Sequence, residues 1–439
     1  MKVKNMAYVF NESIELMPRE EKKILQGKRL RAVVERCYNN VPTYREKMIE
    51  AGITPEDINT IDDIVKLPFT TKKDLRANYP FGMFAAPQEE IVRVHASSGT
   101  TGKLTVVGYT QHDLDDWSEA CARGFASCGV TKNSIIHVAY GYGLFTGGLG
   151  AHYGGEYMGA TVVPASSGNT ARQIMLMKDF KADTLCCTPS YAVYLVDELH
   201  KAGLTAEDLS LKQGFFGAEP WTEEMRVKIE EGLGLKAYDI YGLSEITGPG
   251  VATECEYQAG PHVQDDLFYP EIIDPVTLEP VPEGEEGELV FTTLSKEGMP
   301  LIRYRTRDLC SLIYEPCKCG RTSLRLARIT GRSDDMLIIR GVNVFPSQIE
   351  SVLIKDKRIS PYYHITIDRI NNLDIMQIDV ELERTVAFDE IKEIEALQKK
   401  VSADIASAIG VSAKVNLVSC GTIKRSEGKA VYVTDNRKI

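Results

Sequence analysis

The sequence has no apolar run near the roughly 20 residues that a membrane-spanning helix needs. Its first residues, Met1 to Asn5, lead into mixed polar sequence without the apolar stretch of a secretory signal. It also shows no internal repeat and no low-complexity tract. We therefore expect a cytoplasmic protein that has no membrane partner.

An excess of positive charge is also missing. The 51 lysines and arginines are outnumbered by 62 acidic residues, which gives a formal net charge of −11. Bulk attraction to nucleic acid is therefore not expected, and we predict no nucleic-acid partner. An anionic small molecule would need local cations, of the kind that Lys103 and Lys429 supply.

Cysteines are present in moderate number. There are ten, including the adjacent pair Cys186-Cys187. Without a signal peptide we expect a reducing compartment, in which most of these residues are free thiols that pack as small apolar side chains. The 439 residues are enough for two or three domains, and a hydrophobic content of 43% is ordinary for a globular protein.

Helices and strands alternate along much of the chain. Residues 12–50 have helical apolar spacing that is broken at Val41-Pro42, and a helix is predicted over 111–128. Further on, a helix is expected to begin at Pro189. Strands are predicted near residues 91–94, 106–109, 135–139, 161–163, 184–187, 214–217 and 238–241. This alternation predicts an α/β fold with a mostly parallel sheet, whose ligands bind at the carboxyl ends of the strands.

The pattern of predicted secondary structure changes after about residue 260. Residues 261–328 read as short β-rich runs with turns, and the polar run 328–335 follows. We place a boundary there, which divides the chain into an N-terminal domain (1–331) with a β-rich subdomain and a small mobile C-terminal α/β domain (332–439). In the latter, strands are predicted at 336–339, 363–367 and 376–382, and helices at 346–354 and 388–409.

The stretch from Ser97 to Lys103 concentrates hydroxyls, glycines and a lysine. Glycines let backbone N–H groups turn inward, and hydroxyls and a lysine add donors and charge, which suits phosphate oxygens. A solvated polar turn is the alternative. The stretch does not fit the Walker pattern, because Ser97 replaces its first glycine and Leu104 follows the lysine.

The segment Ser97–Lys103 resembles the phosphate loop of the adenylate-forming superfamily of acyl-CoA synthetases. Four further motifs follow in the order of that superfamily. They are Tyr241-Gly242-Leu243-Ser244-Glu245, Tyr304-Arg305-Thr306-Arg307-Asp308, Gly331-Arg332-Ser333-Asp334-Asp335 and Ser426-Glu427-Gly428-Lys429. Together with Leu67-Pro68-Phe69-Thr70-Thr71-Lys72 and Asn78-Tyr79-Pro80-Phe81-Gly82, they resemble the phenylacetate-CoA ligase family.

This resemblance implies ATP, Mg²⁺ and coenzyme A as ligands. It assigns Lys429 to the carboxylate and α-phosphate during adenylation, Glu245 to Mg²⁺, which prefers hard oxygen ligands, and Asp334 to the hinge of the C-terminal domain. The residues that it implies for ATP or AMP are Ser97, Ser98, Gly99, Thr100, Thr101, Gly102, Lys103, Gly217, Ala218, Glu219, Pro220, Tyr241, Gly242, Asp308 and Arg332.

These assignments have plain structural alternatives: Glu245 as a helix N-cap or solvated acid, Arg332 and Asp334 as surface ion pairs, and Lys429 as a solvated lysine. Tyr241 matches the position that packs on adenine, although a tyrosine after a strand is more often part of a core. Asp308 matches the acid that accepts hydrogen bonds from the ribose hydroxyls. The close arginines Arg305 and Arg307 offer it an ordinary ion pair instead, and both readings can hold.

The Gly/aromatic run Tyr140–Phe145 follows a predicted strand. Its aromatic rings could wall a flat acid pocket, with glycines leaving room, or simply anchor a loop. The superfamily places its acyl pocket here, and we take Tyr140, Phe145 and Gly147 as pocket residues. Phenylacetate, hydroxyphenylacetate, indoleacetate and benzoate-like acids all fit such a pocket.

A separate set of residues offers metal ligands. Cys255 and His262 lie seven apart, and Cys317 and Cys319 follow in a C-x-C pair. Three thiolates and an imidazole suit a structural tetrahedral Zn²⁺, although C-x-C is tighter than the common C-x-x-C. Cys310 could replace one ligand, and unpaired buried cysteines are the alternative.

The sequence thus predicts an ATP-dependent ligase that activates an aryl acid as the acyl-adenylate and forms its CoA thioester. An enzyme that loads the acid onto a carrier protein is one alternative. A non-catalytic nucleotide-binding protein is another, which the joint presence of Lys429, Asp308 and Glu245 opposes. By resemblance we also expect a homodimer.

Overall fold

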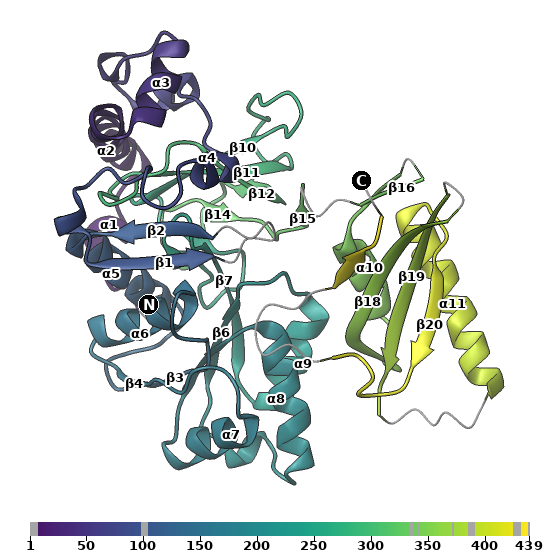
Figure 1. Ribbon diagram of the computed structural model, residues 1–439. Coiled ribbons are helices and arrows are strands. Elements are labelled where there is room, and N and C mark those ends of the chain that lie inside the picture. Colours follow the sequence, from purple (N-terminus) through teal and green to yellow (C-terminus); the bar gives the residue numbers. More distant parts are fainter. Residues whose placement is uncertain are drawn as a thin grey trace.

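The computed structural model describes residues 8–97, 104–333, 337–340, 342–370, 373–384, 391–424 and 432–437. Figure 1 shows a large body, which runs from the purple N-terminal helices to strand β15, and a smaller C-terminal unit beside it. None of the described helices is both long and apolar enough to cross a membrane.

The chain begins with helices, as the apolar spacing predicted. They are α1 (Glu12–Glu15), α2 (Arg19–Asn40), α3 (Pro42–Glu50) and α4 (Lys72–Ala77), with short 3₁₀ turns at Pro55–Asp57, Ile61–Lys66, Gln88–Glu90 and Ala206–Asp208 elsewhere. Pro42 sits in the first turn of α3, where its missing N–H removes no intrahelical hydrogen bond. Leu30, Val34 and Tyr44 are buried in a core that these helices share with the strands of the body.

A nine-stranded sheet forms the centre of the body, in the order β13-β14-β9-β8-β7-β6-β5-β3-β4. Its parallel half comprises β3 (Ile135–Val138), β4 (Thr161–Val163), β5 (Thr184–Cys187), β6 (Gln213–Gly217) and β7 (Lys236–Leu243). Its antiparallel half comprises β8 (Gly248–Thr253), β9 (His262–Val263), β13 (Leu312–Ile313) and β14 (Arg325–Leu326). The parallel half is the part that the helix–strand alternation predicted.

Helices pack on both faces of the parallel half. The helices are α5 (Gln111–Ser127) and α6 (Thr146–Tyr157) for one core, and α7 (Thr170–Asp179), α8 (Pro189–Lys201) and α9 (Glu223–Leu233) for the other. Cys186 belongs to the first core and Cys187 to the second, because successive side chains of a strand point to opposite faces. All ten cysteines are free thiols, as expected.

Two further antiparallel sheets complete the body. The larger contains β10 (Phe268–Ile273), β11 (Gly287–Thr293), β12 (Tyr304–Cys310) and β15 (Gly331–Arg332), and the smaller is the hairpin of β1 (Arg93–Ser97) and β2 (Thr105–Tyr109). The strands predicted within residues 261–328 are thus divided between the larger of these two sheets, which takes β10, β11 and β12, and the nine-stranded sheet, which takes β9, β13 and β14. The register of the larger antiparallel sheet places Asp308 directly opposite Arg332, which brings two predicted site residues together.

The C-terminal unit has a core of its own. It contains β16 (Leu337–Ile339), β17 (Val342–Val344), α10 (Pro346–Leu353), β18 (Ile359–Ile370), β19 (Leu373–Leu382), α11 (Ile391–Ile409), β20 (Lys414–Val418) and β21 (Val433–Asp435). Its sheet has the order β20-β19-β18-β21, and the unit meets the body near α9 and β15 (Figure 1). An ion pair of 2.9 Å between Lys228 Nζ and Glu383 Oε1 joins α9 to this unit.

Candidate active site

Three side chains meet where the predicted phosphate loop leaves the β1–β2 hairpin. The Ser97 hydroxyl donates to Glu245 Oε1 over 3.1 Å, and Lys72 Nζ lies 3.2 Å from the same oxygen. Glu245 is buried, whereas Lys72, the first residue of α4, is partly exposed. This arrangement places a carboxylate and an ammonium group at the mouth of the loop, whose residues 98–103 lie outside the described part of the chain.

Lys72 is a candidate that the sequence reasoning did not single out. It lies within the quoted Leu67–Lys72 motif, but nothing local to that motif links it to Glu245, more than 170 positions further on. The only available signal was that a lysine occurs in a motif of the resembled family. The contact itself depends on how α4 packs beside the hairpin, since these elements are in contact.

Asp308, Tyr241 and Arg332 form the second cluster. The Tyr241 hydroxyl donates to Asp308 Oδ2 over 2.5 Å, and Arg332 Nη1 lies 2.8 Å from Asp308 Oδ1. The Tyr241 ring stacks on Phe291, with centroids 6.0 Å apart. Burial, followed by the Asp308 charge, raises the pKa of Tyr241 well above its usual value, so the hydroxyl stays protonated and remains a donor.

The neighbouring arginines do not form the ion pair with Asp308 that we had left open. Arg305 Nη2 lies 2.7 Å and Arg307 Nη1 3.4 Å from the same oxygen of Glu288, which is fully buried. Side chains of a strand alternate between the two faces of the sheet, so a sequence neighbour of Asp308 points away from it. The partner of Asp308 comes instead from the adjacent strand, β15.

The motif Gly217–Pro220 lies at the carboxyl end of β6, beside that of β7. Ala218 has a φ of 73°, a left-handed value that is uncommon outside glycine and that clusters at functional sites. Glu219 is buried, and its Oε1 accepts a 2.7 Å hydrogen bond from the backbone N–H of Ser190. That N–H belongs to the first turn of α8, where a carboxylate is favoured by the helix dipole.

Gly242 lies in β7, close against the Gly248 end of β8. A Cβ at this position would lie 1.9 Å from the Gly248 carbonyl oxygen, so no larger residue fits. The hairpin that follows carries Glu245, and the Ser244 and Thr146 hydroxyls contact over 3.0 Å. The close approach of these strands therefore sets the position of Glu245 relative to α6.

An apolar cavity lies between the sheet and the helices α5 and α6. Its lining consists of Cys121, Phe125, Tyr140, Ala151, Cys186, Phe215, Ile240, Pro249, Gly250 and Thr253. Of the pocket residues expected from sequence, Tyr140 is buried and lines the cavity. The other lining residues come from six elements or their connections and shared no local pattern, so sequence reasoning missed them.

Phe145 and Gly147 lie beside this cavity at the start of α6. Phe145 is 43% exposed, and its ring centroid lies 6.4 Å from that of Tyr140. A Cβ on Gly147 would approach the Phe145 ring to 2.4 Å, so the glycine leaves room for that ring. Phe145 thus stands outside the lining, next to its aromatic wall.

The four proposed metal ligands converge although they come from separate segments. Cys255 follows β8, His262 lies in β9, and Cys317 and Cys319 lie between β13 and β14. Their ligand atoms all lie within 4.8 Å of one another. Cys310 is buried in β12 and is not part of this cluster.

The distances within the cluster match a tetrahedral ion. Cys255 Sγ and Cys317 Sγ are 3.7 Å apart, and Cys319 Sγ and His262 Nε2 are 3.4 Å apart. A Zn²⁺ bound at the usual lengths of about 2.3 Å to sulfur and about 2.0 Å to nitrogen separates such pairs by about 3.8 and about 3.5 Å. The other nitrogen, His262 Nδ1, contacts the Ser323 hydroxyl over 3.1 Å. A metal-binding histidine usually makes such a hydrogen bond through its second nitrogen, which fixes the orientation of the ring.

The thiols of the cluster affect one another strongly. A hydrogen bond from Cys255 lowers the pKa of Cys319, with His262 acting in the same direction, whereas that bond and burial raise the pKa of Cys255. Burial alone would lower the pKa of His262, but hydrogen bonds to Cys317 and Cys319 raise it. The mutual shifts follow from the short distances within the cluster, whose ligand atoms all lie within 4.8 Å of one another.

Two further predicted residues, Lys429 and Asp334, lie outside the described residues, as residues 98–103 do. The neighbouring Arg332 belongs to β15, the last strand of the body, and the Ser347 hydroxyl of α10 donates over 2.5 Å to the Thr330 carbonyl. The described residues on either side of Asp334 therefore connect the body to the C-terminal unit.

Comparison with protein families gives two matches. Residues 54–295 match the AMP-binding enzyme family, and residues 341–437 match the AMP-binding enzyme C-terminal domain. The chain is 53% identical over 413 residues to a phenylacetate-coenzyme A ligase of Pseudomonas putida, which covers 94% of this chain and 93% of that protein. It is 50% identical to a phenylacetate-coenzyme A ligase of Escherichia coli, with 98% of each covered.

Solved structures agree with this result. A 2-hydroxyisobutyryl-CoA ligase in the postadenylation state, in complex with an acyl-AMP, superposes with a TM-score of 0.92 at 30% identity, covering 99% of this chain and 93% of that one. The same ligase in the thioesterification state, with an acyl-AMP and CoA, gives a TM-score of 0.74 and covers 99% and 94%. The present arrangement of body and C-terminal unit is thus more similar to the postadenylation state.

Proposed function

This chain belongs to the AMP-binding enzyme family, among the phenylacetate-CoA ligases, and we propose that its acid substrate is phenylacetate or a ring-substituted relative. The reaction class follows from the family. The enzyme is an AMP-forming acid–CoA ligase that uses ATP and coenzyme A. It works in two steps, adenylation followed by thioester formation, so the carrier-protein and non-catalytic alternatives fall away.

Both steps balance without a further reactant. In the first, a carboxylate oxygen of the acid attacks the α-phosphorus of ATP. The bond between the α-phosphorus and the oxygen that bridges the α- and β-phosphates breaks, and pyrophosphate leaves with that oxygen. In the second, the thiol of coenzyme A loses its proton and attacks the acyl carbon, and AMP leaves. The first step brings two anions together, so it needs cations and preorganised donors at the reacting oxygens.

The residues of the site can be assigned to these needs. We propose that Ser97–Lys103 hold the β- and γ-phosphates and that Glu245 carries Mg²⁺, with Lys72 orienting its carboxylate. Asp308, held by Tyr241 and Arg332, is oriented to accept hydrogen bonds from the ribose hydroxyls. Lys429 supplies the cation for the carboxylate and α-phosphate, and the residues Gly217–Pro220 and Gly242 line the adenine side.

The observation that best supports an aryl acid as the substrate is the apolar cavity that Tyr140 lines. Phe125, Tyr140 and Phe215 give it aromatic walls, and none of the described residues that line it is charged. A flat ring gains about 0.5–1.5 kcal/mol from aromatic contact beyond its buried area, whereas a flexible alkyl chain must also be ordered at an entropic cost. An aryl acid is therefore favoured over an alkyl acid of similar size.

The test compares kcat/KM for phenylacetate and hexanoate by pyrophosphate release, with ATP and coenzyme A saturating. We expect phenylacetate to be preferred, and Phe145→Ala to raise its KM about tenfold, the equivalent of roughly 1.4 kcal/mol, with little change in the KM for ATP. Leu144→Ala is the matched control, because Leu144 is a neighbouring exposed side chain. A preference for hexanoate would overturn the aryl pocket and leave the ligase reaction standing.

We further propose that Cys255, His262, Cys317 and Cys319 bind a structural zinc ion. The proposal is supported by their spacing and by the second contact of His262 with Ser323. The site lies on the antiparallel edge of the nine-stranded sheet, away from the clusters around Glu245 and Asp308, so its contribution is to folding rather than to the chemistry. The homodimer, the cytoplasmic location and the division into residues 1–331 and 332–439 remain predictions.

A further inference from the structure

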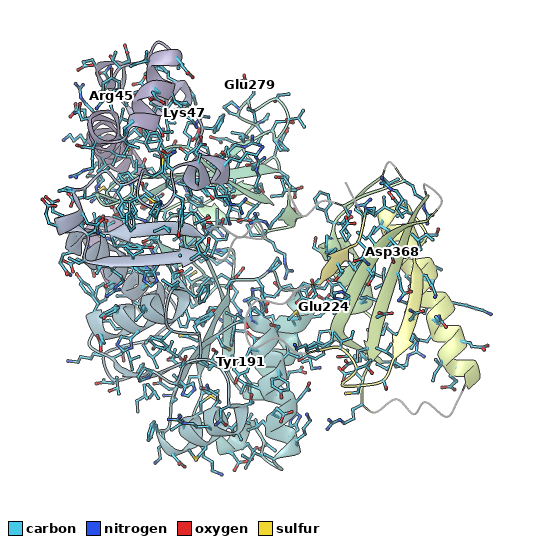
Figure 2. All side chains as sticks on the ribbon, viewed as in Figure 1. Arg45, Lys47, Tyr191, Glu224, Glu279 and Asp368 are labelled. Atoms are coloured by element: carbon cyan, nitrogen blue, oxygen red, sulfur yellow. The ribbon has the colours of Figure 1, made fainter. Side chains whose placement is uncertain are left out.

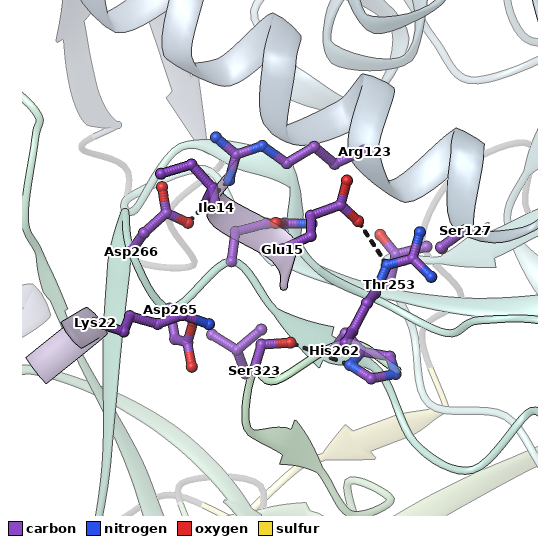
Figure 3. Close-up of a pocket in the computed structure, with 13 residues that line it drawn as sticks. Ile14, Glu15, Lys22, Arg123, Ser127, Thr253, His262, Asp265, Asp266 and Ser323 are labelled. Atoms are coloured by element: carbon purple, nitrogen blue, oxygen red, sulfur yellow. Dashed lines mark hydrogen bonds and ion pairs between the residues drawn. The ribbon is translucent and has the colours of Figure 1, made fainter. Parts of the chain in front are cut away.

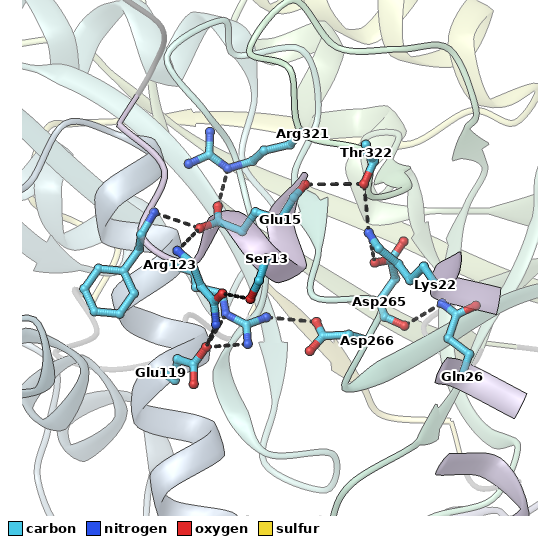
Figure 4. Close-up of polar contacts among 12 residues, drawn as sticks. Ser13, Glu15, Lys22, Gln26, Glu119, Arg123, Asp265, Asp266, Arg321 and Thr322 are labelled. Carbon is cyan, nitrogen blue, oxygen red and sulfur yellow. Dashed lines mark hydrogen bonds and ion pairs between the residues drawn. The ribbon is translucent and has the colours of Figure 1, made fainter. Parts of the chain in front are cut away.

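The chain that follows Cys319 binds the N-terminal arm, defined here as residues 8–22. Arg321 makes the central contact, since its Nε donates to Glu15 Oε2 over 2.5 Å (Figure 4). Its Nη2 donates to the Tyr8 carbonyl over 2.8 Å. The Glu15 side chain in turn accepts 2.8 Å hydrogen bonds from the backbone N–H groups of Phe10 and Asn11. One arginine, two positions beyond a proposed metal ligand, thus orders the first turn of the arm.

Thr322 fixes the rest of the arm. Its backbone N–H donates to the Glu15 carbonyl over 3.1 Å, and its hydroxyl donates to the Met17 carbonyl over 2.6 Å. Arg19 Nε donates to the Thr322 carbonyl over 3.1 Å, and Lys22 Nζ donates to the Thr322 hydroxyl over 3.2 Å. Both ends of the arm therefore contact the same short loop.

The segment that contains His262 also contacts the N-terminal arm. Asp265, three residues after His262, pairs with Lys22 over 2.9 Å and accepts a 3.1 Å hydrogen bond from the Leu324 N–H. Figure 3 shows His262, Ser323, Asp265, Lys22 and Glu15 around one small polar cavity. The proposed metal ligands and the residues that hold the arm thus form one continuous set of contacts.

These contacts are buried, so their geometry matters. Glu15, Lys22, Asp265 and Arg321 are each 3–6% exposed. A buried ion pair is favourable only while both partners stay in place, because a buried charge that loses its partner is strongly destabilising. Any displacement of residues 319–323 would take the Arg321 guanidinium away from Glu15. Because Glu15 is buried, water would not take the place of that guanidinium.

The net charge expected for the metal-bound cluster also favours a cation beside it. Three thiolates, a neutral imidazole and Zn²⁺ together carry one negative charge, and Arg321 is the neighbouring cation. Its guanidinium pairs with the Glu15 carboxylate over 2.5 Å. Arg321 therefore serves both as a partner to the cluster and as the anchor of the arm.

We propose that the metal cluster is a latch for the N-terminal arm. The bound ion fixes residues 317–323 in the conformation that presents Arg321 and Thr322, and its removal releases residues 8–22 from the body while the rest of the fold persists. This inference rests on the zinc site proposed above and adds a specific consequence to it.

The experiment measures zinc content and amide hydrogen exchange on the full-length protein, before and after a zinc chelator. We expect one zinc per chain, and exchange in residues 9–22 that becomes about ten- to a hundredfold faster on chelation, as the loss of a buried charged hydrogen bond predicts. Peptides of β18 and β19, in the separate C-terminal core, should keep their exchange rates.

Variants separate the metal from the arm. Cys317→Ser should lose zinc and accelerate exchange in residues 9–22, whereas Cys420→Ser, which alters an exposed cysteine outside the cluster, should do neither. Glu15→Gln should accelerate exchange in the arm and keep the zinc, because it cuts the link beyond the ligands.

The outcomes distinguish the two proposals. Absence of zinc from protein produced in zinc-supplemented medium would overturn both the metal site and the latch. Bound zinc whose removal leaves residues 9–22 unchanged, or loosens the whole chain equally, would overturn the latch alone. None of these results bears on the ligase reaction, which pyrophosphate release measures independently.

Discussion

Asp308 illustrates how single side chains prepare this site. One of its carboxylate oxygens is held by Tyr241 at 2.5 Å and the other by Arg332 at 2.8 Å. These contacts fix the carboxylate plane before a ligand arrives, so little ordering is left for binding. The two nearest arginines in sequence are directed to Glu288 instead, and they therefore stabilise the sheet rather than the site.

At this scale we predict that Asp308→Asn raises the KM for ATP about ten- to a hundredfold. The amide loses one acceptor and the charge that pairs with Arg332, and a hydrogen bond to a charged group is worth about 1.5–3 kcal/mol. Steady-state kinetics with ATP and the acid varied separately would measure it. Asp115→Asn, at an exposed site on α5, is the control, and an unchanged KM for ATP would remove Asp308 from the nucleotide site.

At the scale of elements, α10 carries a buried acid toward the body. Glu350 is 5% exposed, and its Oε2 lies 3.5 Å from the Tyr363 hydroxyl. Burial raises its pKa to about 7, Glu219 and Glu224 of the body add to the rise, and Arg328 opposes it. Figure 2 shows Glu224 where α9 faces the C-terminal unit. Two acidic groups of the body thus act on Glu350 across the junction.

This pKa shift predicts a pH dependence of stability. Between the ordinary value of 4.5 and about 7, the folded protein binds more protons at Glu350 than the unfolded chain does. The free energy of unfolding contributed by this group is therefore fully present below the lower value and is lost as the pH rises through the upper one. Above about pH 7 the loss is complete.

We expect the melting temperature of the wild type to fall a few degrees more than that of Glu350→Gln between about pH 5 and about pH 7.5. The glutamine keeps a neutral side chain of the same shape throughout. Glu279→Gln, on an exposed turn of the body (Figure 2), should retain the wild-type slope. Equal slopes for the wild type and Glu350→Gln would show that Glu350 does not titrate in this range.

At the scale of the whole molecule, the position of the C-terminal unit relates to the two steps of the reaction. The chain superposes better on a ligase in the postadenylation state than on the same ligase in the thioesterification state, with TM-scores of 0.92 and 0.74. Two polar contacts between the described residues, Lys228–Glu383 and Ser347–Thr330, join the C-terminal unit to the body in this arrangement.

We predict that Asp334→Pro separates the two half-reactions. Proline fixes φ near −65°, and a hinge works by changing its backbone angles. Pyrophosphate release in a single turnover should persist, while formation of the CoA thioester should fall about a hundredfold or more. The first half-reaction is the internal control for folding, and normal steady-state thioester production would exclude Asp334 as the hinge.

The sequence by itself determined the parts of this protein that are encoded locally. Apolar periodicity and prolines located most helices and the parallel strands, because side-chain spacing follows the backbone repeat of each element. Ordered motifs around Ser97, Tyr241 and Asp308 identified the family. The four metal-ligand candidates were found from residue type and spacing alone, although spacing could not decide between Cys310 and its neighbours.

Only the tertiary structure decided which distant residues meet. The register of β12 against β15 gave Asp308 its arginine, and the packing of α4 brought Lys72 to Glu245. The apolar cavity behind Tyr140 takes its lining from several elements, and Arg321 pairs with Glu15, which lies some 300 positions away in the sequence. The physical reason is that a local pattern fixes the direction of a side chain on its own element, whereas its partner depends on how separate elements pack into one core.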